Sequence, residues 1–250
     1  DDQTDDWSRL KRALSTTHKI FNLTAGLPIL RQLGPKLRQY DWNVTAVVET
    51  DTWEQPDGPP RLLNLLPVAK TNGQSPSTGN QIWGIAVDIG TTTVSLYLVD
   101  MQSGQVFTKA AEYNAQIKRG EDVISRIIYS GKDGLAELQT LVIDTINTLI
   151  ERATRRAKIE PDHIYKMTVS GNSTMIHLFL GLPSTSIRLE PFVTGINQPP
   201  PVLAAELGIN IYPQASVDCL PGVASYVGAD ISAGVVGVQM GHDQALTLFL

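Results

Sequence analysis

The sequence has 250 residues, 42% of them hydrophobic and 18% charged, with a formal net charge of −5 and one cysteine. A chain of this length can bury the core of one large domain or of two smaller ones, and its hydrophobic content excludes wholesale disorder. No apolar run reaches the roughly 18 residues of a membrane span, the first residues lack the blocks of a signal peptide, and the acidic balance disfavours nucleic acid or an anionic membrane as partners.

Residues 1–70 are predicted to form a small α/β domain. Its expected helices and strands lie at 8–15, 27–34, 44–50 and 61–68. Gly34 and Pro35 are expected to close the second helix, unless 36–40 extend it. The polar residues of 71–80, rich in Gly, Ser and Pro, are predicted to be a linker.

From residue 81 the pattern is sharper. Three strands with tight connections predict an antiparallel meander, followed by helices alternating with two further strands. The predicted strands are 82–88, 94–99, 105–113, 163–169 and 217–220, and the predicted helices are 121–130, 135–158, 175–180 and 225–238. This order indicates an α/β fold with a mixed five-stranded sheet. The small residues of 225–238 predict a helix that packs closely against its neighbours.

The sequence starts without Met, and residues 244–250 have the apolar pattern of a buried strand. We therefore expect a piece of a longer protein. The single cysteine, Cys219, can form neither an internal disulfide nor a self-contained iron–sulfur site. It is interpreted as a buried, inert thiol in a cytoplasmic protein.

The segment Asp88-Ile-Gly-Thr-Thr-Thr93 is the first candidate site. A carboxylate at the end of a buried strand can hold Mg²⁺, and Gly90 lets backbone amides converge on an anion. The hydroxyl groups of Thr91, Thr92 and Thr93 add donors. A phosphate–metal complex needs this pairing, although the same residues also suit a plain β-hairpin turn.

Two further segments carry small polar residues at expected helix starts. Gly171 and Asn172 lie where a strand runs into a helix, so the exposed amides there can attract an anion, or Asn172 can simply cap the helix. Asp230 either complements a helix dipole or provides a second carboxylate near Mg²⁺ or an attacking water.

The remaining charged and histidine residues give weaker signals. Arg119 and Arg126 are interpreted as solvated surface charges, with phosphate or a partner's carboxylate as the alternative contact. His177 lies on an apolar helix and is interpreted as a satisfied core residue rather than a metal ligand, because the four histidines show no ligand spacing.

Four segments, in this order and at these separations, resemble those of the reductive activators of corrinoid proteins. They are 84–94, 114–127, 171–175 and 228–230. The resemblance implies an actin-like ATPase (ribonuclease H-like) first lobe over 81–243, with 244–250 starting a second lobe. Residues 1–70 resemble the small middle domain of that family more weakly, with 71–80 as the linker.

The resemblance also implies the chemistry. Such activators bind Mg-ATP and restore Co(I) in a cobalamin-carrying protein by ATP-dependent reduction of Co(II), so ATP and Mg²⁺ are the expected cofactors. A [2Fe–2S] cluster is expected in a domain outside this sequence, and a homodimer is implied. The implied site residues are Asp88 for the metal and catalysis, Asp230 for catalysis, and Gly90, Thr91, Thr92, Thr93, Gly171 and Asn172 for the nucleotide.

Two other functions remain open on the sequence. The first is an actin-like small-molecule kinase, which would need a catalytic base and a substrate pocket with no distinct signature here. The second is a non-catalytic, nucleotide-sensing module that docks on another protein. Whether the chain is an enzyme by itself stays open, because one lobe lacks the opposing donors that hold a transition state.

Overall fold

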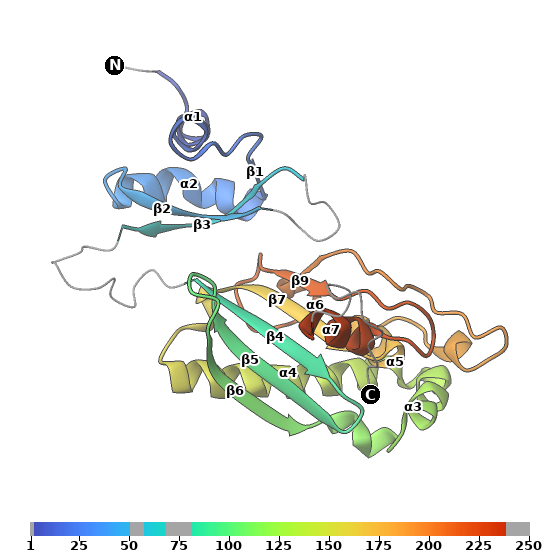
Figure 1. Ribbon diagram of the computed structural model, residues 1–250. Coiled ribbons are helices and arrows are strands. Elements are labelled where there is room, and N and C mark those ends of the chain that lie inside the picture. Colours follow the sequence, from blue (N-terminus) through green and yellow to red (C-terminus); the bar gives the residue numbers. More distant parts are fainter. Residues whose placement is uncertain (1–2, 51–57, 69–81, 239–250) are drawn as a thin grey trace. The chain divides into compact units, whose positions relative to one another are not determined.

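The computed structural model describes residues 3–50, 58–68 and 82–238. The chain divides into two compact units, Asp1–Gln81 and Ile82–Leu250 (Figure 1). The predicted linker at 71–80 and the predicted strand at 244–250 both lie outside the described residues. Within the described ranges, no helix has the length and apolar character needed to cross a membrane.

The first unit packs helices on a three-stranded sheet. Its elements are α1 (Asp6–His18), β1 (Thr24–Ala25), α2 (Leu27–Gln39), β2 (Val44–Glu49) and β3 (Arg61–Pro67). The strand order is β1-β3-β2, with β1 parallel and β2 antiparallel to β3. Both predicted helices and both predicted strands are confirmed, and only the two-residue β1 was not expected.

Helix α2 does not end at Gly34 and Pro35 but continues to Gln39. Its buried residues Ile29, Leu33 and Leu37 recur at every fourth position, so one apolar face runs through the proline and packs without interruption. Pro35 lacks only one backbone donor, and this continuous burial outweighs that loss. Of the two alternatives, extension of the helix into 36–40 is therefore confirmed, and closure at Gly34 and Pro35 is wrong.

The second unit is built on a six-stranded mixed sheet in the order β6-β5-β4-β7-β9-β8. Its strands are β4 (Trp83–Ile89), β5 (Thr93–Asp100), β6 (Val106–Tyr113), β7 (Ile164–Gly171), β8 (Val202–Leu203) and β9 (Ser216–Cys219). Strands β4, β5 and β6 form the predicted antiparallel meander, and β4, β7 and β9 run parallel.

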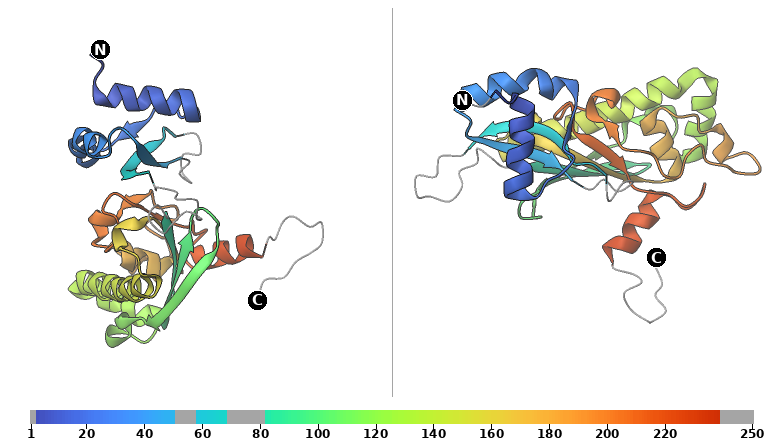
Figure 2. Two further views of the ribbon diagram at one scale, coloured as in Figure 1. Left: turned by 90° about the vertical axis from the view of Figure 1, so that its left-hand side faces the viewer. Right: turned by 90° about the horizontal axis from the view of Figure 1, so that it is seen from above.

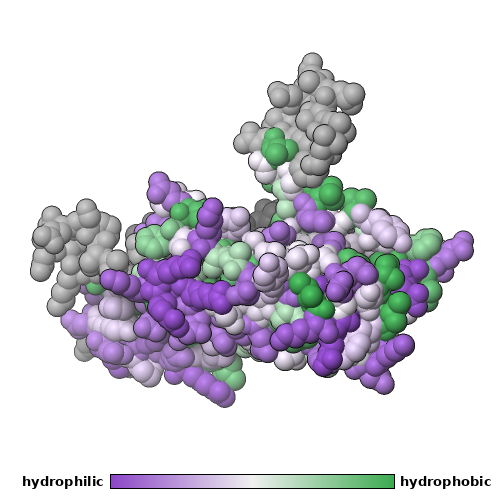
Figure 3. Space-filling model, turned by 90° about the horizontal axis from the view of Figure 1, so that it is seen from below, coloured by the Kyte–Doolittle hydropathy of each residue, from purple (hydrophilic) through white to green (hydrophobic). Residues whose placement is uncertain are grey.

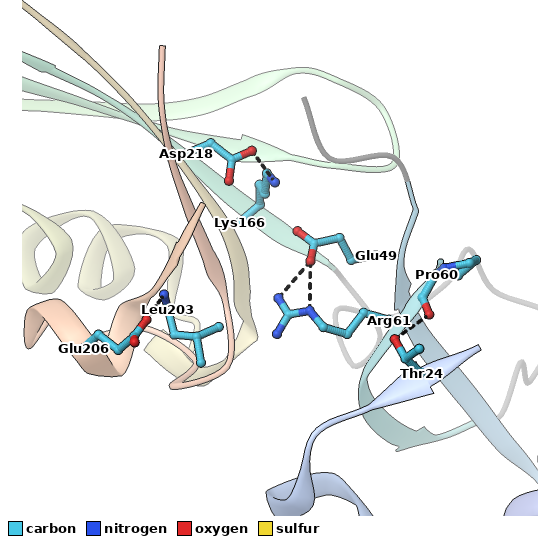
Figure 4. A network of polar contacts seen from close by, with 8 residues as sticks. All are labelled: Thr24, Glu49, Pro60, Arg61, Lys166, Leu203, Glu206 and Asp218. Atoms are coloured by element: carbon cyan, nitrogen blue, oxygen red, sulfur yellow. Dashed lines mark hydrogen bonds and ion pairs between the residues drawn. The ribbon is translucent and has the colours of Figure 1, made fainter. Parts of the chain in front are cut away.

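This topology confirms the expected fold class, an α/β ribonuclease H-like lobe preceded by a small α/β unit. The sheet has six strands rather than the expected five, because β8 adds an antiparallel edge to β9. A two-residue strand after a run of prolines leaves no alternating pattern that sequence analysis could find. The ion pair between Lys166 and Asp218, with 2.6 Å between Nζ and Oδ2, joins β7 to β9 (Figure 4).

The main helices lie on one face of this sheet, and one short helix lies on the other (Figure 2). The helices are α3 (Val123–Tyr129), α4 (Leu135–Ala157), α5 (Ser173–Leu180), α6 (Ala204–Leu207) and α7 (Ala229–Gly237). Short helical turns lie at Ala115–Arg119, Ser130–Gly134, Pro161–His163 and Thr185–Ile187. The buried face of α4 packs on β5 and β6, while α7 is the short helix on the opposite face of the sheet.

Helix α7 is shorter than expected and less tightly packed. It begins at Ala229 because residues before it form a turn in which the Val227 N–H donates to the Ala224 carbonyl, and Gly228 caps the helix. Of its residues only Ala229 is buried; Ala233 is half-buried, and Gly237 is exposed. The predicted close packing over 225–238 therefore holds at the start of the helix, at Gly228 and Ala229, and is wrong for the residues that follow.

The edge of the sheet at β6 is covered by arginines from α4. Arg152 forms an ion pair with Glu112, with 2.7 Å between Nη2 and Oε2, and Arg156 donates to the Lys109 carbonyl at 2.9 Å. Charged side chains of this kind protect an edge strand from pairing with another chain. The face of the molecule shown in Figure 3 is mainly hydrophilic, with hydrophobic residues in separate patches.

The packing of α4 can be tested with two neighbouring residues. Leu149 is fully buried against the sheet, whereas Thr148 is exposed on the same helix. We expect Leu149→Ala to lower the free energy of unfolding by about 2–5 kcal/mol, because it removes buried methyl groups and leaves a cavity. Thr148→Ala should change it by less than about 0.5 kcal/mol. Equal effects in urea denaturation would contradict the packing described for α4.

Candidate nucleotide site

The candidate site lies at the carboxyl ends of β4 and β7. These strands are parallel neighbours, and their register sets Asp88 opposite Ser170 and Ile89 opposite Gly171. The loop after β4 and the start of α5 after β7 therefore leave the same edge of the sheet. In open α/β sheets this edge is the usual place for a ligand, because strand ends and helix starts meet there.

The loop after β4 turns three successive carbonyls toward one side of the backbone. The carbonyls of Gly90 and Thr92 accept from the side-chain amide and the backbone N–H of Asn114, at 2.9 and 2.8 Å. The Thr91 carbonyl accepts from Nη2 of Arg126 at 2.5 Å. In a trans peptide the N–H points opposite to the carbonyl, so the amides of Thr91 and Thr92 face away from Asn114 and Arg126. Adjacent amides of this kind can bind an anion.

The start of α5 is joined to this loop by one side chain. Asn172 caps α5 by accepting from the Met175 N–H at 2.9 Å. Its Nδ2 atom also donates to Oγ1 of Thr91 at 3.4 Å. Asn172 thus has the ordinary capping role that the sequence allowed, and it also connects the two loops.

Two carboxylates face this part of the sheet. Asp88 is the last residue but one of β4, and Asp230 lies in the first turn of α7, where its Oδ1 accepts from the Ile231 N–H at 2.9 Å. Partial loss of water around Asp88, and then the negative charge of Asp230, raise the pKa of the Asp88 carboxyl above its ordinary value. The two residues are thus close enough to repel each other, and a cation between them would relieve that repulsion.

The donor set fits Mg²⁺ bound together with phosphates. Within the described part of the chain, no group of three or more His, Cys, Asp or Glu residues could hold a metal ion by itself. Mg²⁺ does not need such a group, because it keeps several waters and uses one or two carboxylates plus phosphate oxygens. At such a site Asp88 and Asp230 would supply the carboxylates, and the amides of the loop would supply phosphate donors.

Two glycines allow the close approach of these segments. A Cβ atom on Gly228 would lie 2.6 Å from the Asn172 Cα and 2.7 Å from the Ser173 nitrogen. A Cβ atom on Gly90 would lie 2.6 Å from the Thr93 carbonyl oxygen. Backbone atoms cannot yield as side chains do, so only glycine fits at these two positions.

Sequence analysis missed the role of Arg126. Arg119 is exposed and pairs with Glu137, as expected of a surface charge. Arg126, in contrast, is fully buried and contacts the candidate loop, so its interpretation as a solvated surface charge is wrong. The available signal was the cluster of polar residues over 114–127, including Asn114 and Gln116, which are also fully buried.

His177 and Cys219 have the structural roles that the sequence predicted. The His177 ring is fully buried, with Nδ1 2.6 Å from the Ser173 carbonyl oxygen and Nε2 accepting from the Gly195 N–H at 3.0 Å. Burial lowers the pKa of His177, so the neutral ring is favoured. Burial raises the pKa of the Cys219 thiol to about 12, which makes it unreactive at neutral pH.

Known protein families match both units. A model described as the RACo middle region matches residues 83–243, and one described as the RACo linker region matches residues 1–72. These descriptions call the first unit a linker region and the second unit a middle region. The resemblance instead implied a middle domain over 1–70 and the first lobe of an ATPase over 81–243.

Two individual proteins are also similar. The corrinoid activation enzyme RamQ of Eubacterium limosum is 36% identical over 192 residues, which are 76% of this chain and 31% of that protein. A solved structure, the reductive activator for corrinoid, iron–sulfur protein, is 37% identical with a TM-score of 0.83, over 97% of this chain and 37% of that one. The chain thus spans about a third of the length of each.

The close approach of α7 to α5 can be tested at two glycines. We expect Gly228→Ala to destabilise the second unit by about 1–3 kcal/mol, because the new methyl group meets backbone atoms. Gly237→Ala is the control, since Gly237 is the last residue of the helix that Gly228 caps and has nothing within 4 Å of a Cβ atom. It should leave the free energy of unfolding unchanged or raise it by up to about 1 kcal/mol. A neutral Gly228→Ala variant in thermal unfolding would contradict the approach.

His177 predicts a pH dependence of stability. Its pKa is lowered in the folded protein, so below pH 6.5 the unfolded chain binds a proton that the folded chain does not. The stability that this group contributes is therefore complete above pH 6.5 and is lost as the pH falls toward its folded pKa, by at most about 1.4 kcal/mol per pH unit. Urea unfolding of His177→Gln should show a smaller loss between pH 7.5 and 5.5, and equal losses would contradict this role.

Proposed function

The chain belongs to the RACo family, and we propose that it is the ATP-binding part of a redox activator that restores Co(I) in a corrinoid protein by ATP-dependent reduction of Co(II). The observation that supports this proposal is the convergence of the loop after β4, the start of α5 and the carboxylates of Asp88 and Asp230. The names of the two similar proteins support the corrinoid partner.

Each group in the site has a distinct part in binding. The amides of Thr91 and Thr92 and the N-terminus of α5 would bind phosphate oxygens, which carry the negative charge that both favour. Asp88 would hold Mg²⁺ directly or through water, and Asp230 would add a second negative charge near the metal. Thr91 and Asn172, which contact each other, would fix the distance between the two phosphate-binding segments.

The lobe would couple ATP to reduction through binding energy. Mg-ATP, when bound, would supply phosphoryl-transfer chemistry. The residues at the ends of β4 and β7 would bind and orient it and would hold the loop in one conformation. A ligand shifts a conformational equilibrium only by its difference in affinity for the two states. We infer that nucleotide at this site changes how the activator binds the corrinoid protein, and thereby how readily cobalt accepts an electron.

The proposal is tested by the one-electron reduction of a Co(II) corrinoid protein by the native activator, with a chemical reductant supplying the electron through the expected iron–sulfur cluster. The absorbance of Co(I) is followed with and without Mg-ATP. ATP should increase the yield or rate of Co(I). A yield and rate that do not respond to ATP would overturn the proposed function. ATP hydrolysis without any response to the corrinoid protein would instead favour a small-molecule kinase, and ATP binding without hydrolysis would favour a non-catalytic nucleotide sensor.

The part played by Asp88 predicts opposite effects on two measurements. Asp88→Asn removes the repulsion from Asp230, so the free protein should melt at the same temperature as the wild type or higher. The rise in Tm that Mg-ATP produces should be lost, because the neutral amide cannot hold Mg²⁺. Asp144→Asn, at an exposed position on α4, is the control and should keep the full shift. A full shift in Asp88→Asn would place the metal elsewhere.

A further inference from the structure

Arg126 is a buried cation without a bonded carboxylate. Its Nε atom donates to the Gly120 carbonyl at 2.9 Å, and Nη1 lies 3.2 Å from Oε1 of Gln116 and 3.3 Å from Sδ of Met175. Its Nη2 atom donates to the Thr91 carbonyl at 2.5 Å. Throughout the described ranges, no carboxylate forms an ion pair with this guanidinium.

Such a group is unusual, because burying a charge costs free energy unless an opposite charge or strong hydrogen bonds offset it. Here the atoms bonded to the guanidinium are neutral carbonyl, amide and sulfur atoms. Burial lowers the pKa of Arg126, and the charge of Asp122, which is not bonded to it, offsets only part of that effect. Its positive charge is therefore not neutralised by a bonded carboxylate, and it lies directly behind the loop whose amides face the other way. An anion in front of that loop would interact favourably with this charge.

The side chains that bind the carbonyl side of this loop are themselves hydrogen-bonded to the core. Oδ1 of Asn114 accepts from the Gln116 N–H at 3.0 Å, and Nε2 of Gln116 donates to the Leu138 carbonyl at 2.9 Å. Asn114, Gln116 and Arg126 are all fully buried, so their side chains have little freedom to move. This network connects the loop to α4 and prevents its peptides from rotating.

We propose that Arg126 is the positioning residue of this site: it holds the Thr91 carbonyl so that the Thr92 amide faces the phosphates of the nucleotide, and its charge favours those phosphates. The ligand class is a nucleoside phosphate, and the inference rests on the proposed function. Arg126 does not touch the ligand. It acts through the peptide between Thr91 and Thr92.

The test compares ATP with adenosine in the native protein, using isothermal titration. Arg126→Lys keeps a charge but cannot form both the Gly120 and the Thr91 contacts, because an ammonium lacks the planar fork of a guanidinium. We expect its affinity for Mg-ATP to fall about tenfold to a hundredfold, the effect of losing a charge-assisted hydrogen bond, while adenosine binds as before. Arg119→Lys, on the exposed side of the same segment, should leave both affinities unchanged.

Arg126→Gln is the second variant, in case the lysine variant does not fold. It removes the charge and keeps a donor, and it should also weaken Mg-ATP selectively. Equal losses for ATP and adenosine would show general damage to the fold and would overturn the positioning role. Unchanged ATP affinity in a folded variant would overturn it as well, while leaving the proposed function intact. A wild-type protein that binds no ATP would overturn both.

Discussion

Parallel pairing of β4 with β7 is the constraint on which the site depends. Its register places Asp88 beside Ser170 and Ile89 beside Gly171, so two loops far apart in sequence start from one edge of the sheet. Shifting a strand by one residue would turn Asp88 toward the apolar core and Val87 or Ile89 toward the site. The buried alternation of Ile85, Val87 and Ile89 therefore fixes the position of the carboxylate as well as the core.

The anion-binding role proposed for the loop after β4 needs amides that face outward, and that orientation turns the carbonyls of the loop inward, where they need hydrogen-bond donors. The structure meets this need with Asn114 and Arg126, which donate to three carbonyls in a row. These donors come from segments that follow the β-meander, so the loop cannot reach its final shape until the chain up to α3 has folded onto it. Local backbone geometry is thus fixed by residues that are about 25 to 35 positions away.

Local patterns predicted much of this arrangement. Alternation and helical spacing located β4, β5, β6, α4 and β7, because burial on one face gives each element its own period. Asp88 and Gly90 were identifiable because a carboxylate and a glycine follow an apolar strand. The burial of Arg126 was not predictable, since an arginine on an amphipathic helix is usually solvated and only tertiary contacts decide otherwise. The role of Gly228 was not predictable either, because its contact with Asn172 joins two segments that no local sequence pattern relates.

The charges around the loop explain why one ligand class suits the whole site. Asp88 and Asp230 repel each other and would be relieved by a cation, whereas the amides of Thr91 and Thr92 and the buried charge of Arg126 favour an anion. Arg126 cannot itself neutralise the carboxylates, because its donors are engaged with Thr91, Gly120 and Gln116. A free phosphate would satisfy only the loop amides and Arg126, and a lone metal ion would satisfy only the two carboxylates. A magnesium–nucleoside phosphate complex carries both charges, which is the physical reason for proposing it over either component alone.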